Sequence, residues 1–321
     1  MSIDIGRLGS LGLGIEASAG SANTTAMVYL PYTENSMRGH HEPIENISSK
    51  KSRIMDTSSV LGRRWSEGDV KILADVRNSG YLWYLATGFD TVNTGTPNSH
   101  TFYPTVSGNT PPTATLINSR GTIDIEQYTY CAIDELTFEV SDGIAEMTAS
   151  FQGQYPTAGA AQTVTTTSGT VLAFKDYFVQ FGSTLTTAAA AGTTPISEFS
   201  FVIANNLEVI HRSGSSDVSS IRNKGVRATG SYKLFFESVS DRDAYYALNK
   251  RAMIVTFSGS ANEGLRIRIP QFRLNEAEVD TGLDDFYALT ADFTAEDVVD
   301  TAGVRYFDVR LQNDKSTAYT A

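Results

Sequence analysis

The chain has 321 residues, of which 41% are hydrophobic and only 19% are charged. This length predicts one large or two medium domains with a real core, and the low charged fraction is unusual for a soluble monomer. The net charge of −11 argues against a protein that grips nucleic acid through its phosphates, although a protein that surrounds nucleic acid without holding it stays open.

The first part of the chain predicts an arm followed by β-structure. Residues 1–26 are rich in Gly, Ser and Ala and are expected to form an N-terminal arm or loop. A short apolar strand is expected over 27–32. The polar stretch 33–66 predicts exposed hairpins or a long loop, and residues 67–76 alternate well enough to predict a strand.

A short helix is expected directly after that strand. Asn78 or Ser79 is placed to cap its first turn, and Gly88 is a typical stop. The spacing of Tyr81, Leu82 and Leu85 puts all three on one helical face, which we expect to be buried. Residues 93–112, within the polar stretch 93–120, are expected to form a loop with a short strand near 101–103.

The clearest strand pair in the sequence is a hairpin over 131–153. Leu136, Phe138 and Val140 alternate with polar residues, and Ser141-Asp142-Gly143 supplies a turn. The alternation resumes in the returning strand, with Met147, Ala149 and Phe151. We therefore expect a β-hairpin with one apolar and one polar face.

The second part of the chain also predicts mostly strands. Residues 155–170 are low in complexity and are the best candidate for a linker, and 186–194 form a second such stretch. Residues 196–204 and 207–212 are expected to pair with each other as strands. The further expected elements are a strand over 225–237, a helix over 241–251, and strands over 253–258, 265–269, 285–294 and 306–312.

A strand-then-helix unit occurs twice at a constant spacing. Gly68 precedes a strand that is followed by Trp83-Tyr84, and Gly230 precedes a strand that is followed by Tyr245-Tyr246, with the same separation between glycine and aromatic pair in both copies. This pattern predicts a duplicated β module. We expect an N-terminal arm (1–26), a first module (27–154), a linker (155–170) and a second module (171–321).

No constellation of residues predicts a catalytic, cofactor or metal site. Gly12–Ala17 fits a loose G-x-G-x-x-A, but the alternating β and α elements of a dinucleotide fold are absent from the pattern. The four histidines, His40, His41, His100 and His211, lack metal-ligand spacing. Cys131 is the only cysteine, which fits folding in a reducing cytoplasm, and it predicts a small structural residue. We expect no secretory signal and no membrane span.

The order of these elements resembles that of the tail tube proteins of long-tailed bacteriophages. The resemblance covers about residues 10–312. It is carried by an opening rich in Gly with one acidic residue (Gly12–Ser18 with Gly20) and by a strand and helix (Ser66–Ile72 and the helix through Gly88). A long hairpin (Cys131–Val140 with Ile144–Gly153) and a C-terminal pattern (Arg268–Phe272, Gly282-Leu283 and Phe286–Phe293) add to it.

The resemblance implies a mainly β fold of sandwich or barrel modules with short flanking helices. It also implies a non-enzymatic virion protein that forms hexameric rings, which stack into a tube through which DNA passes during ejection. The implied partners are further copies of the chain and other tail proteins, namely a terminator, an initiator or baseplate, and a tape measure or sheath protein. Assembly would take place in the host cytoplasm, and DNA would pass without tight binding.

Two other functions stay open from the residues alone. The first is the inner tube of a phage-derived injection system, and the second is a β-sandwich module that binds carbohydrate. A tube protein would form rings or polymers, whereas a lectin-like module would stay monomeric or form small oligomers. The stretch 274–304 has nine acidic residues and no Lys or Arg, and it predicts either a solvated edge or a functional surface.

Overall fold

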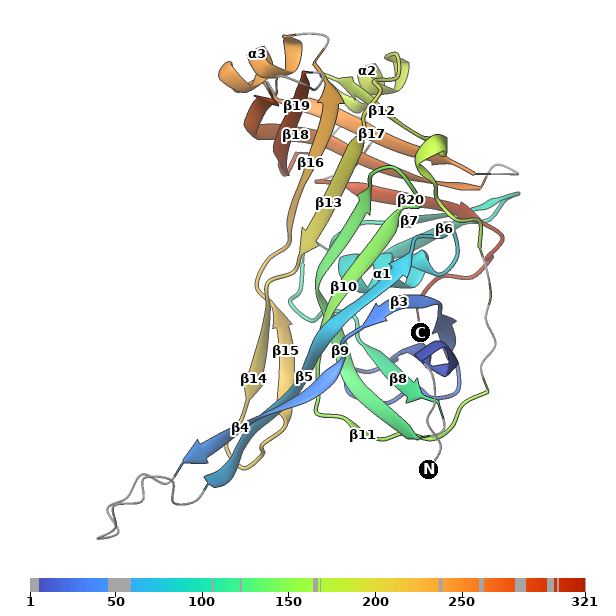
Figure 1. Cartoon of the computed structure of the whole chain (residues 1–321), viewed down its shortest axis with the longest axis vertical. Helices are drawn as coiled ribbons and strands as arrows, with labels where there is room; N and C mark the ends of the chain where they lie inside the picture. The colour runs from blue at the N-terminus through green and yellow to red at the C-terminus, as the bar shows by residue number, and fades with distance from the viewer. Residues whose placement is uncertain are drawn as a thin grey trace.

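The computed structural model describes residues 6–45, 59–105, 107–121, 123–163, 167, 169–236, 239–259, 263–280, 287–298, 303–304 and 306–320. Strands dominate these residues, with three short α-helices and two 3-10 turns, so the expectation of a mainly β fold is confirmed. The molecule is elongated: the hairpin that contains β4 (Arg38–Glu45) projects at one end, and α2 (Leu185–Ala190) and α3 (Ser240–Tyr246) lie at the other (Figure 1).

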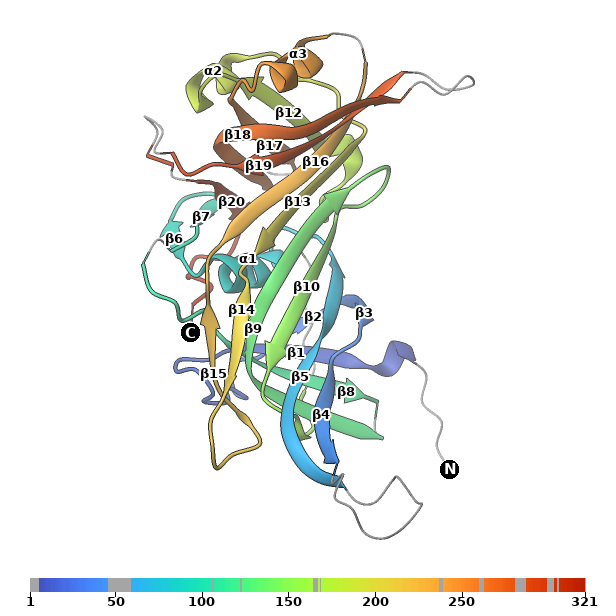
Figure 2. The same cartoon turned by 90° about the vertical axis from the view of Figure 1, so that its left-hand side faces the viewer.

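Seven antiparallel strands form one continuous sheet, the central sheet, which runs through both halves of the chain. Their order is β5 (Ser59–Leu73), β10 (Glu146–Gly153), β9 (Asp124–Val140), β13 (Glu198–Ala204), β16 (Arg227–Phe235), β19 (Ala288–Ala295) and β18 (Gly264–Asp280). The ladder between β9 and β13 joins the strands of the first half to those of the second. Figure 2 shows β16, β13, β9, β10 and β5 side by side.

The first three and the last three strands of the central sheet share their order and register. β10 lies between β5 and β9, and β19 lies between β16 and β18. Gly68 faces Phe151, and Gly230 faces Phe293, so the repeat seen in the sequence also holds for the strand pairing. The facing strands read Met-Thr-Ala-Ser-Phe from 147 and Leu-Thr-Ala-Asp-Phe from 289.

A second layer grows out of the N-terminal half of β9. This half pairs with β8 (Ala114–Arg120), which pairs with β1 (Ser10–Ile15), and β1 pairs with β2 (Val28–Leu30). The two-residue strand β11 (Thr157–Ala158) lies against the other edge of β9. Residues 10–15 therefore form a strand of the core and not the expected arm or loop, because the Leu and Ile side chains of β1 are buried.

Shorter strands border the central sheet. On the β5 side they are β3 (Tyr32–Asn35) and β4, and beyond β18 they are β17 (Arg251–Ser258) and β12 (Tyr177–Gly182). β20 (Asp308–Asn313) links β18 to β7 (Asn98–Phe102), and β7 pairs with β6 (Asp90–Asn93). Part of the 33–66 stretch is thus a hairpin as expected, while residues 46–58 lie outside the described residues.

The helix α1 (Ser79–Thr87) packs on the apolar side of β9. Asn78 occupies the N-cap position, but its side chain makes no cap hydrogen bond and donates instead to Asp75 and to the Thr167 carbonyl. Gly88 ends the helix in a left-handed conformation with φ of 87°, which glycine adopts without strain. Leu82 and Leu85 are fully buried and Tyr81 is half-buried, so the predicted buried face is confirmed. Trp83, also fully buried, lies 5.8 Å from the ring of Phe138 in β9.

Three local predictions in the second half of the chain were wrong. β13 and β14 (Leu207–His211) do not pair with each other: β13 lies between β9 and β16, and β14 pairs with β15 (Val218–Asn223). The low-complexity stretch 186–194 contributes most of α2. Thr184 and Thr187 form a capping box at the first turn of this helix. The helix expected over 241–251 ends at Tyr246, because β17 already begins at Arg251.

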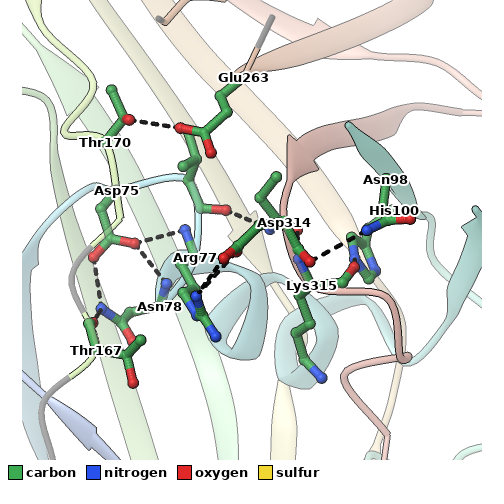
Figure 3. A network of polar contacts seen from close by, with 12 residues as sticks. Asp75, Arg77, Asn78, Asn98, His100, Thr167, Thr170, Glu263, Asp314 and Lys315 are labelled. Atoms are coloured by element: carbon green, nitrogen blue, oxygen red, sulfur yellow. Dashed lines mark hydrogen bonds and ion pairs between the residues drawn. The ribbon is translucent and has the colours of Figure 1, made fainter. Parts of the chain in front are cut away.

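A polar network ties the turn before α1 to segments far away in the sequence (Figure 3). The Asp75 carboxylate accepts hydrogen bonds from the backbone N–H groups of Arg77 and Asn78, each at 2.6 Å. The Asn78 amide donates to the Thr167 carbonyl at 2.9 Å, and the Arg77 guanidinium donates to both carboxylate oxygens of Asp314 at 3.0 and 2.8 Å. The expected linker and the C-terminal segment are therefore both fastened to the first half of the chain.

Candidate assembly surface

Strand alternation gives the central sheet one apolar and one polar face. Direct cross-strand neighbours share a face. One polar row crosses the sheet from Glu146 through Glu139, Ser200, Ser231 and Asp292 to Glu276, with every step a paired position. The face of the sheet that contains this row is called the polar face below.

Acidic residues outnumber basic ones on the polar face. In the mutually paired segments, the acidic residues are Glu67, Asp69, Glu135, Glu139, Glu146, Glu198, Glu276, Glu278 and Asp292, and the basic residues are Lys71, Arg227, Lys233 and Arg273. This surplus covers both halves of the central sheet. The negative charge of the chain is therefore located on the polar face as well as in the acidic stretch 274–304.

Most of the lysine charge on this face is already paired with carboxylates. Lys71 Nζ lies 2.7 Å from a carboxylate oxygen of Glu146 and 3.9 Å from one of Glu139. The hydrogen bond to Glu146 raises the pKa of Lys71, so the ammonium group stays charged and held at the sheet. Lys233 Nζ lies 3.5 Å from Glu198. The polar face therefore offers few unpaired cations to a phosphate backbone.

The acidic residue of the Gly-rich opening has a structural role. Glu16 is buried, and its carboxylate accepts hydrogen bonds from the hydroxyls of Thr113 and Thr115 at 2.7 and 2.9 Å. The backbone N–H groups of Tyr130 and Gly20 donate to the same carboxylate at 2.9 and 2.8 Å. Glu16 thus ties the end of β1 to β8 and β9, and no helix follows β1 as a dinucleotide site would require.

The other sequence candidates are scattered through the structure. His40 and His41 lie on β4, His100 is buried in β7, and His211 lies on β14. Within the described ranges, no three His, Cys, Asp or Glu side chains are grouped so that they could hold a metal ion. Cys131 is fully buried in β9, and burial raises the pKa of its thiol, so the group is inert.

His100 belongs instead to the contact between the C-terminal segment and β7. Its Nδ1 lies 3.2 Å from a carboxylate oxygen of Asp90, and its Nε2 lies 2.9 Å from the carbonyl oxygen of Lys315. Tyr319 packs edge-on to the imidazole at 4.7 Å. Sequence reasoning missed this cluster, because its members come from segments that lie far apart in the chain.

Comparison with known families agrees with this β architecture. A family model described as phage tail tube protein matches residues 6–295. The chain belongs to the phage tail tube protein family. No curated protein matches the chain in sequence.

Family membership indicates that the polar face and its edges serve in assembly. A tail tube protein has a structural role in the virion tail and assembles with other tail proteins. The candidate functional surface is therefore one for assembly, made of the central sheet and its borders. Among the described residues no helix is both long and apolar enough to cross a membrane.

Proposed function

We propose that copies of this chain form hexameric rings, which stack into a tube whose lumen is lined by the polar face of the central sheet. DNA passes through this lumen during ejection, and the chain acts without enzymatic activity. The observation that carries the proposal is the continuous polar face across both halves, with α1 packed on the opposite face. Long antiparallel strands that pair around a ring remove the edges that would otherwise aggregate.

The acidic surplus suits a conduit. A lumen rich in Lys or Arg would release counterions on contact with DNA and would bind it with salt-dependent affinity, which would slow its transit. On the polar face, Lys71 and Lys233 are instead paired with glutamates of neighbouring strands. Phosphates would therefore meet a surface that repels them, and DNA would slide without tight binding.

The proposal extends to the organisation and partners of the chain. Residues 27–154 and 171–321 act as two tube modules, with 1–26 as an N-terminal segment and 155–170 as the connection. The matched strand order and register of the two halves support this division. The ring partners are further copies of the chain. The tube ends contact a terminator and an initiator or baseplate, with a tape measure inside or a sheath outside, and assembly takes place in the host cytoplasm.

Negative-stain electron microscopy of the purified chain, alone and with its tail initiator, tests the proposal. Rings with a central hole or hollow tubes are expected in at least one of the two preparations. The control is sedimentation over a wide range of protein concentrations, because a subunit that awaits its initiator stays monomeric. Monomer alone in both preparations would contradict the tube function and favour a β-sandwich binding module.

A further inference from the structure

Two strand edges of the central sheet have no partner among the described residues. One is the outer edge of β18 over residues 276–279: β19 occupies the other edge there, and β17 reaches β18 only as far as Phe272. The second is the outer edge of the β3–β4 segment around residues 36–40, where the only ladder recorded is that with β5. Each edge lacks a neighbouring strand at one border of the central sheet, although at the second edge the Met37 backbone N–H donates to Asn35 Oδ1 and its carbonyl accepts from the Tyr128 hydroxyl.

The β9–β13 ladder, which joins the two halves of the chain, is the internal junction, and each free edge corresponds to one of its two strands. In the β9–β13 ladder, Leu136 faces Ile203 and Phe138 faces Phe201. Leu136 also faces Ala149 of β10, as Ala277 faces Ala291 of β19, so position 277 of β18 corresponds to position 136 of β9. The free stretch 276–279 therefore corresponds to 135–138, which β13 covers.

The same comparison identifies the counterpart of β13. Ile203 faces Ala228 of β16, and Gly39 faces Ser66 of β5. Ser66 and Ala228 are equivalent positions, because each lies two residues before the glycine of its repeat. Position 39 of the β3–β4 segment therefore corresponds to position 203 of β13. Residues 37–40 correspond to 201–204, the part of β13 that pairs with β9.

Resting on the proposed ring, we propose that β18 of one copy pairs antiparallel with the β3–β4 segment of the next copy, as β9 pairs with β13 inside the chain. The two correspondences fix the register of this junction. Val279 lies opposite Met37, Glu278 opposite Arg38, Ala277 opposite Gly39, and Glu276 opposite His40. The occupant of each free edge is a second copy of the same chain.

Charge is complementary in this register. Arg38 is exposed, and its Nε donates to Nε2 of His40 at 3.1 Å, which gathers the two nitrogen-bearing side chains on one side of β4. Glu276 and Glu278 are exposed, and neither has an ion-pair partner in the part of the chain that the structure describes. The junction would set Arg38 against Glu278, an arrangement that favours the correct register and disfavours slipped ones. His40, whose Nε2 accepts from Arg38 and lies 3.4 Å from Glu67 of the same chain, would lie opposite Glu276 as a polar neighbour.

The apolar side of the junction is complementary as well. Phe201 and Phe138 are fully buried against each other at the internal junction, and Met37, which takes the place of Phe201, is 2% exposed. Val279, which takes the place of Phe138, packs on the core but stays half-exposed. Pairing with the next copy would complete its burial. Tyr155 and Pro156 already fill the space beside Gly39 that a larger side chain would need.

This geometry closes a ring without leaving free edges. Each chain has one edge of each kind, so the contact is head-to-tail, and such contacts generate a ring when the rotation closes. Junctions within and between chains then alternate around the ring. Each chain contributes two equivalent segments of the central sheet, so a ring of six chains has twelve segments and a ring of three chains has six. The mass of one ring distinguishes the two arrangements.

Charge reversal tests the register. We expect Arg38→Glu and Glu278→Arg each to weaken ring formation on the order of tenfold, since like charges would then face each other. The chain with both substitutions is expected to recover rings, because the pair is restored with opposite sign. The matched control is Glu135→Arg, which changes the same polar face within β9, a strand that has partners on both sides inside the chain. Sedimentation and negative-stain microscopy give the readout.

Cross-linking gives a second, direct measurement. A chain with Arg38→Cys and Glu278→Cys should form a covalent ladder of multimers on oxidation, because directly opposite residues lie within disulfide reach. A chain with Arg38→Cys and Ala277→Cys, whose side chains would point to opposite faces, should not. Rings that survive both single reversals and give no cross-link would overturn this junction while leaving the tube function intact. Wild-type protein that forms neither rings nor tubes would overturn both.

Discussion

Gly230 lies directly opposite Phe293 in the central sheet, in the same register that sets Gly68 opposite Phe151. At the first of these pairs, a Cβ atom on Gly230 would lie 2.5 Å from Cζ of Phe293, so the ring covers the glycine. Phe293 also lies 5.4 Å from Phe272 in β18. Gly230 thus makes room for an aromatic cluster at the centre of the second half, whereas a Cβ atom on Gly68 would meet the backbone of Ser36 and Met37 in the neighbouring segment.

Gly230→Ala should destabilise the fold through overpacking. The new methyl group would collide with the carbonyl oxygen of Ser200 and with the Phe293 ring, and such changes cost about 1–3 kcal/mol. Chemical denaturation of the monomer measures the effect. Gly192→Ala is the matched control, since no atom lies within 4 Å of a Cβ there, and its stability should match that of the wild type within about 0.5 kcal/mol. Equal stability of both variants would show that β16 shifts freely.

Leu82→Asp should prevent folding. Leu82 is fully buried in α1, and an unpaired carboxylate at that position would lose its hydration without gaining a partner. The milder Leu82→Ala should fold with a loss of about 2–5 kcal/mol. Far-UV circular dichroism and denaturation provide the measurements. The control is Tyr246→Asp in α3, where the side chain is 72% exposed. Normal tubes from Leu82→Asp would show that the buried face was wrongly assigned.

Tyr319 should hold the C-terminal segment on the first half of the chain. The side chain is fully buried, accepts a hydrogen bond from the Asn313 amide at 2.8 Å and donates one to the Arg77 carbonyl at 2.8 Å. Tyr319→Phe should cost about 1 kcal/mol because these partners lose the hydroxyl. Tyr319→Ala should cost about 3–5 kcal/mol and expose the segment to carboxypeptidase. An alanine variant as stable and as resistant as the wild type would contradict this role.

Local patterns predicted the elements that local physics controls. The alternation of Leu136 and Phe138 predicted β9 and its hairpin partner, and Gly88 predicted the end of α1. Both depend on neighbours within a few residues. The glycines of β1 instead suggested a loop, although the buried Leu11 and Leu13 alternate with them as in a strand. Packing against β2 and β8 overrides the weak β propensity of glycine.

Pairings over long sequence distances were beyond local patterns. The sequence Glu198-Phe199-Ser200-Phe201 is similar to Glu135-Leu136-Thr137-Phe138, as expected for copies in separate modules, yet the structure pairs these two stretches as neighbours, with Phe201 facing Phe138. A sequence cannot say which of several similar strands will be adjacent. A signal for the repeat was nevertheless present in Met147–Phe151 and Leu289–Phe293, which share Thr, Ala and Phe at matching positions. The acidic polar face followed from the same alternation once the strand order was known.

Acid should weaken the contact between the end of β19 and the strands beside it. The Lys250 ammonium lies 2.7 Å from Glu296, and this hydrogen bond lowers the pKa of the Glu296 carboxyl. A carboxyl whose folded pKa is lowered stabilises the fold above its unfolded pKa of about 4.3, and this contribution is lost as the pH falls through the folded pKa.

Glu296→Gln should therefore cost up to ~1 kcal/mol at pH 7, a small figure because the ion pair is partly solvated. The difference from the wild type should vanish toward pH 3. Denaturation curves at several pH values measure it, with Glu208→Gln as a control because its pair with Lys224 is long, at 3.6 Å, and largely exposed. A difference that grows in acid would have the wrong sign for this assignment.

Charge reversal on the polar face should turn a weak DNA binder into a strong one. Glu135 and Asp292 belong to the polar face in the two halves of the central sheet, and neither has an ion-pair partner among the described residues. Wild-type tubes are expected to bind DNA weakly even at low salt. Tubes with Glu135→Lys and Asp292→Lys repeat the new cations around every ring, and each cation that engages a phosphate adds about 0.9 to the slope of log K against log salt.

The control for this experiment carries the same charge change away from the central sheet. Glu208→Lys on β14 and Asp243→Lys on α3 alter the net charge equally but lie outside its seven strands. DNA binding by preformed tubes, titrated with salt, compares the three proteins. Strong, salt-sensitive binding by the polar-face variant alone would support a lumen lined by the polar face. Equal binding by both variants would show that this face does not line the lumen, and tight binding by wild-type tubes would contradict the conduit mechanism itself.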